Sequence, residues 1–156
     1  MKQIALQPAV TKLATYSGTD YVFRFNPKEI VVTLDVASCE QDDLDETYDI
    51  YITTGDGVSS WDIIHFPQLT TDAAYRYTAG VNCRLALQNV TSAVPGVAAN
   101  DPATFKTDTE GAGNAVLTLA SGYVRHGPIG NRIGYRLVVA GTVTVGIVYS
   151  IRVSMR

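Results

Sequence analysis

Apolar and polar residues alternate along much of this chain. In the longest example, residues 143–153, every odd position is apolar and the even positions are mostly polar or small. A period of two held over this length predicts a β-strand with one buried side and one solvent-facing side. Shorter segments share the alternation: residues 21–25, 30–36, 48–52, 75–79 and 83–87.

Turn-forming residues separate these segments, and no window shows a sustained helical period of 3.6 residues. Gly, Pro, Asn, Asp and Ser stand between apolar runs at residues 17–18, 26–27, 55–57, 66–67 and 141. Short strands cut by such turns are typical of antiparallel sandwiches and barrels. We therefore expect an all-β fold, an antiparallel, jelly-roll-like β-sandwich of eight or nine strands.

The length of 156 residues predicts a single domain. We assign residues 18–156 to the sandwich, with a long loop at 90–115, and residues 1–17 to an N-terminal arm or an edge strand. The chain shows neither a signal-peptide pattern nor an apolar run long enough to cross a membrane. We expect synthesis in the host cytoplasm and no membrane partner, and Cys39 and Cys83 as buried free thiols rather than a disulfide.

Charge is divided unevenly along the chain, although its net value is only −3. Residues 121–156 contain five arginines and no acidic residue, so residues 1–120 carry an acidic excess. The sequence pI of about 5.2 argues against nucleic acid as the main partner. Two interpretations remain open: head-to-tail pairing of a basic edge with a neighbour's acidic loop, or neutralisation of the two halves within one fold.

The residues that could carry chemistry form no recognisable catalytic or metal-binding motif. Residues 40–46 are acidic but lack the EF-hand order, and His65 and His126 lack further ligands at zinc spacing. Ser59 and Ser60 precede Asp62 and His65 without a nucleophile-elbow motif. We expect no enzyme activity, no cofactor and no metal. We interpret Trp61 as a core residue rather than a stacking platform.

Arginines in the basic segment are our candidate interface residues, because arginine is enriched at binding hot spots. For any single arginine, the simpler interpretation is that it keeps one face of a sheet soluble. The four candidates are Arg125, Arg132, Arg136 and Arg152.

Two stretches resemble small virion structural proteins of tailed bacteriophages. In the first, an aspartate–apolar–tyrosine strand at residues 48–54 precedes a Trp61–Asp62 strand that ends in histidine and phenylalanine within residues 61–68. In the second, an arginine precedes a sharp turn at residues 122–125, and a basic final hairpin begins at residues 129–136. The resemblance covers roughly residues 46–154.

The resemblance implies a non-enzymatic β-sandwich that decorates and stabilises the capsid by binding between capsid subunits. The implied partners are the major capsid protein or neighbouring virion proteins, the implied location is the virion, and a homo-oligomer, first of all a trimer, is expected. One alternative is a head–tail connector, neck or tail component. A second alternative, from another class, is a jelly-roll carbohydrate-binding module.

Overall fold

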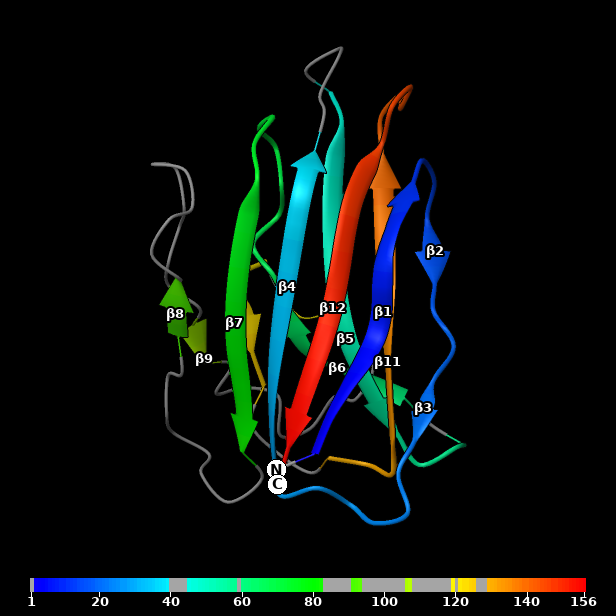
Figure 1. Cartoon of the computed structure of the whole chain (residues 1–156), viewed down its shortest axis with the longest axis vertical. Coiled ribbons are helices and arrows are strands. Elements are labelled where there is room, and N and C mark those ends of the chain that lie inside the picture. Colours follow the sequence, from blue (N-terminus) through cyan, green and yellow to red (C-terminus); the bar gives the residue numbers. More distant parts are fainter. Residues whose placement is uncertain are drawn as a thin grey trace.

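Two antiparallel β-sheets packed face to face make up the fold, and Figure 1 shows them as two layers. The computed structural model describes residues 2–39, 45–58, 60–82, 91–93, 106–107, 119, 121–125 and 129–156. Within these residues every regular element is a strand, and no helix is long and apolar enough to cross a membrane. The predicted all-β antiparallel sandwich is confirmed, whereas its jelly-roll connectivity stays a prediction.

The first sheet contains five strands, and all of its strand pairs are antiparallel. Its strand β12 is hydrogen-bonded on both sides, to β1 and to β4, and is therefore central. In spatial order the strands are β1 (Lys2–Lys12), β12 (Ile147–Met155), β4 (Glu29–Cys39), β7 (Tyr75–Asn82) and β8 (Thr91–Ala93).

The second sheet contains seven strands and is antiparallel apart from the β9–β10 pair, which is parallel. Strand β11 carries two short edge strands, β2 and β3, on the same side. In spatial order the strands are β2 (Tyr16–Ser17), β11 (Arg132–Ala140), β5 (Thr47–Gly55), β6 (Ser60–His65), β10 (Tyr123–Val124) and β9 (Lys106–Thr107), with β3 (Tyr21–Val22) beside β2.

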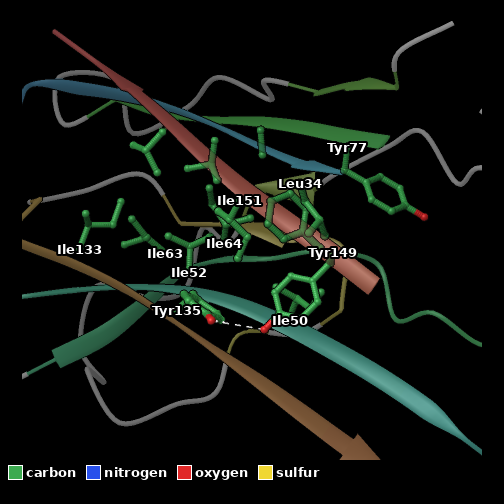
Figure 2. Close-up of a cluster of buried hydrophobic side chains, with 14 of the residues drawn as sticks. Leu34, Ile50, Ile52, Ile63, Ile64, Tyr77, Ile133, Tyr135, Tyr149 and Ile151 are labelled. Carbon is green, nitrogen blue, oxygen red and sulfur yellow. Dashed lines mark hydrogen bonds between the residues drawn. The ribbon is translucent and has the colours of Figure 1, made fainter. Parts of the chain in front are cut away.

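Alternating apolar residues from both sheets fill the space between them (Figure 2). On β12, Ile147, Tyr149, Ile151 and Val153 are buried, while Arg152 between them is exposed. This burial has the parity that the sequence predicts, because successive side chains of a strand point to opposite faces.

A tyrosine pair links the two layers. The rings of Tyr135 on β11 and Tyr149 on β12 meet edge to face with centroids 6.0 Å apart. The Tyr149 hydroxyl donates to the Tyr135 hydroxyl at 3.4 Å, and Tyr135 in turn donates to the Gln7 side chain of β1. Burial raises the pKa of both tyrosines, so both stay neutral donors. The hydrogen bonds allow two polar rings to lie within an apolar core.

The structure corrects the predicted bounds of the last strand. The strand begins at Ile147 rather than at residue 143, and Val145 is 48% exposed. Gly146 has a φ of 85°, and a Cβ atom there would lie 2.3 Å from the carbonyl oxygen of Lys12. Only glycine fits this positive φ and close backbone approach, so residues 143–146 turn instead of extending the strand.

Other segments differ in part from the sequence prediction. In the predicted strand 21–25, the strand ends at Val22, one further backbone hydrogen bond joins Phe23 to Asn131, and Phe25 is 54% exposed. The predicted loop 90–115 contains the short strands β8 and β9, and its other residues lie outside the described part of the chain, as do residues 83–87 with Cys83. Cys39 is buried and free.

The N-terminal segment lies within the chain's own fold. Strand β1 pairs with β12 along its length, with register irregularities on either side of Gln7. Pro8, which has no backbone N–H to donate, falls within the second irregularity. Proline is compatible with an edge strand because one side of that strand has no hydrogen-bond partner. The sequence predicts either an N-terminal arm or an edge strand for residues 1–17, and in the structure β1 is an edge strand.

Candidate functional site

The outer face of the seven-stranded sheet holds the densest group of polar side chains in the described part of the chain. Alternation along β5 directs Tyr48, Ile50 and Ile52 into the core and leaves Asp49 and Tyr51 on the outer face. Antiparallel pairing places His65 of β6 opposite Tyr51. These side chains form one connected network with arginines from later in the sequence.

His65 is held on both sides of its ring and is only 4% exposed. Its Nε2 lies 2.7 Å from Oδ1 of Asp49, and its Nδ1 lies 2.7 Å from the carbonyl oxygen of Leu119. A carbonyl oxygen only accepts hydrogen bonds, so Nδ1 is the donor to Leu119, and Nε2 faces the Asp49 carboxylate. The ring fastens the segment at Leu119 to the sheet.

Asp49 is stabilised in its ionised form. Burial by itself raises the pKa of this carboxyl, but hydrogen bonds from His65 and from Gln68 (2.7 Å) outweigh it. The charges of His65 and Arg136 act in the same direction as these hydrogen bonds. The net pKa lies below the ordinary value of 3.8. Asp49 is therefore a fixed negative charge within the network.

Arg136, one of the four candidate arginines, is engaged inside this network. Its guanidinium carbon lies 3.7 Å from the centroid of the Tyr51 ring, and its Nη2 donates to Oδ2 of Asp62 at 2.7 Å. Arg136 and His65 come from the two strands that flank β5. The His65 ring also stacks on Tyr51, with ring centroids 3.8 Å apart. A cation–π contact combined with an ion pair to a carboxylate uses both properties of arginine.

Arg125 does not lie on the surface, contrary to its expected place at an interface. It is 8% exposed, and its Nη1 donates to the backbone oxygen of Asp62 at 3.3 Å. Its backbone N–H also donates to the carbonyl oxygen of Ile63 at 2.9 Å. Arg125 therefore holds its own segment against β6.

Arg152 lies on the outer face of the other sheet, so the four arginines do not share one surface. Strands β11 and β12 belong to different sheets, and the expected basic final hairpin is not formed. Asp35 lies between Arg152 and Arg76 and pairs with both. Both arginine side chains are about half exposed, at 48% and 50%.

Arg132 differs from the other three. It lines a cavity of about 190 Å³ at the β5–β6 hairpin, together with Asp20, Thr53 and Ser60. Its Nε is buried and has no hydrogen-bond partner. Among the described residues its guanidinium makes neither a hydrogen bond nor an ion pair. At this cavity one of the four candidate arginines has a guanidinium without an ion-pair partner among the described residues.

The other residues that the sequence analysis considered for catalysis, metal binding or stacking form no site in the described part of the chain. His65 pairs with Asp49 and not with Asp62, and Ser59 lies outside the described residues, as do His126 and residues 40–44. Trp61 is half-buried and packs against the core. Within the described ranges no three His, Cys, Asp or Glu side chains gather as metal ligands.

The Asp49–His65 pair was missed by the sequence reasoning. The signal was present as polar residues on the outer-face positions of two neighbouring strands, but their register was needed to bring them together. Comparison with known protein families, curated proteins and solved structures gives no match for this chain.

Proposed function

We propose that the chain is a non-enzymatic virion structural protein of a tailed bacteriophage. In this proposal it decorates and stabilises the capsid by binding between capsid subunits, with the major capsid protein or a neighbouring virion protein as its partner. The sequence resemblance supports the class of protein, and the β-sandwich fold is compatible with it. Assembly as a trimer is part of the same proposal.

One observation supports the proposal of a binding role: four of the six exposed large apolar side chains among the described residues belong to the segment that follows β1 along one edge of the sandwich. The chain passes from β1 to β2 and β3 at this edge, the right-hand side of Figure 1. Large exposed apolar side chains in one region mark interaction surfaces rather than random surface composition. We name this group the apolar edge: Leu13 (49% exposed), Tyr16 (36%), Val22 (51%) and Phe25 (54%).

The polar network supports binding over catalysis. His65 and Asp49 have the chemistry of a catalytic pair, but both ring nitrogens of His65 are occupied by acceptors. Arg136 is engaged by Tyr51 and Asp62. These groups stabilise the fold, and the apolar edge is left for contacts with other proteins.

The primary experiment is mass spectrometry of purified virions from the phage that encodes this chain, with gel densitometry of its copy number. The proposal expects the protein in the particle at hundreds of copies. Its absence from the particle would end the proposal. A copy number near a dozen would instead indicate the neck or tail alternative.

A second experiment tests the apolar edge directly. Val22→Ser with Phe25→Ser removes two exposed apolar side chains and should abolish rebinding of purified protein to particles that lack it. Val148→Ser, on the outer face of the five-stranded sheet, is the matched control and should rebind like the wild type. Equal rebinding by all three proteins would refute the assignment of this edge.

A further inference from the structure

Of the four candidate arginines, Arg132 is the one that has no ion pair with another described residue. Arg136 pairs with Asp62, Arg152 pairs with Asp35, and Arg125 is buried with its Nη1 on a carbonyl oxygen. Arg132 has none of these arrangements, and its Nε is buried without an acceptor. Nε itself is shielded from solvent, so an incoming acceptor reaches Arg132 only where its side chain lines the cavity, and there the charged guanidinium favours an anionic group.

The cavity beside Arg132 has the size and polarity for a single side chain. Its volume of about 190 Å³ lies below the roughly 300–1,000 Å³ typical of small-molecule pockets. The hydroxyls of Thr53 and Ser60 line it and supply further hydrogen-bonding groups. Asp20 also lines it, and its negative charge opposes a multiply charged anion such as phosphate more strongly than a singly charged carboxylate. A carboxylate, with one charge and two acceptor oxygens, matches the guanidinium best.

The two ends of the sandwich differ in charge. The Arg132 cavity lies at the end where the β5–β6 hairpin and both chain termini are found, the lower end in Figure 1. Among the described residues this end carries more basic than acidic side chains. The basic ones are Lys2, Arg24, Lys28, Arg132 and Arg156, and the acidic ones are Asp20, Glu29 and Asp56.

The opposite end, where β5 and β7 begin and β1 ends, carries exposed carboxylates (Figure 1). Asp45 precedes β5 and Asp72 precedes β7, and both are exposed, whereas Lys12 at the end of β1 is a basic residue there. Neither carboxylate has a hydrogen bond or an ion pair with another described residue. Each end of the molecule therefore complements the other end of a second copy.

We propose that the Arg132 cavity binds a carboxylate from the acidic end of a second copy, so that copies of this chain associate head to tail. Such a contact is heterologous: it closes into a ring if the rotation between copies allows it, and otherwise extends into a filament. The interaction belongs to the isolated chain and does not rest on the proposed place in a virion.

Sedimentation velocity of the full-length protein tests this inference. We expect concentration-dependent association at about 20 mM salt that is strongly reduced at about 0.5 M, where screening is nearly complete at contact distances. Arg132→Gln should weaken association about tenfold or more. Arg76→Gln removes the same charge from the side of the sandwich, leaves Asp35 paired with Arg152, and should associate like the wild type.

A mixing experiment keeps the test independent of any single variant's folding. Arg132→Gln removes the charge of the basic end, and Asp45→Asn with Asp72→Asn removes the charges of the acidic end. Each protein alone should associate at least about tenfold more weakly than the wild type, whereas a 1:1 mixture should form dimers and nothing larger, because one complementary charged contact remains. A wild-type chain that stays monomeric at low salt would overturn the proposal. Undiminished association of Arg132→Gln, or equal loss in Arg76→Gln, would do the same.

Discussion

Ile151 and Arg152 are neighbours on the central strand β12, but the fold predicts very different costs for truncating them. Ile151 is 0% exposed and lies between β1 and β4, where Figure 2 shows it among Leu34, Ile52 and Ile64. Because its side chain fills the space between the sheets, Ile151→Ala loses burial and leaves a cavity. Replacing a buried isoleucine with alanine typically costs about 2–5 kcal/mol.

Arg152→Ala should cost much less. Its side chain is 48% exposed and its ion pair with Asp35 is shared with Arg76, so screening by solvent limits the contribution to about 0–1 kcal/mol. Ile151→Val is a graded control that removes a single methylene, with an expected cost of about 0.5–1.5 kcal/mol.

Urea denaturation followed by circular dichroism measures these differences. With a urea m-value of about 2–3 kcal/mol/M, Ile151→Ala should lower the unfolding midpoint by about 1–2 M. The same change should lower the melting temperature by roughly 4–20 °C. Equal shifts for Ile151→Ala and Arg152→Ala would refute the reasoning, because they would mean that residue 151 does not face the other sheet.

Three further predictions concern the buried polar groups. Burial, with smaller contributions from nearby carboxylates, raises the pKa of Cys39 to about 12; in a Cys83→Ser background it should resist alkylation until urea unfolds the chain, and rapid labelling of the folded protein would contradict this. Folding lowers the pKa of Asp49, so its contribution to stability is present above the unfolded pKa and is lost as the pH falls through the folded pKa. In Asp49→Asn the urea midpoint should therefore decline less steeply below about pH 4 than in the wild type. Parallel plots of the midpoint against pH for the variant and the wild type would count against the network. Arg136→Lys keeps the charge but loses the planar contact with Tyr51, so the midpoint should fall by the equivalent of about 1 kcal/mol; an unchanged midpoint would show that the contact contributes nothing.

The order of buried and exposed positions was determined by the sequence itself. Alternation in residues 30–36 and 48–52 predicted which side chains of β4 and β5 face the core, and the burial along both strands agrees. This succeeds because strand parity is a local property, set by the backbone geometry of successive residues. The same local rule failed at residue 145, where the turn at Gly146 interrupts an alternation that continues in the sequence.

Which partner each charged residue has was decided only by the tertiary structure. Arg136 meets Asp62 across 74 positions, and Arg152 meets Asp35 across 117. Such pairs depend on strand order and register, which a single sequence with several similar strands leaves undetermined. The four candidate arginines consequently have four different surroundings, and Arg132 lines a cavity while its buried Nε has no hydrogen-bond partner among the described residues.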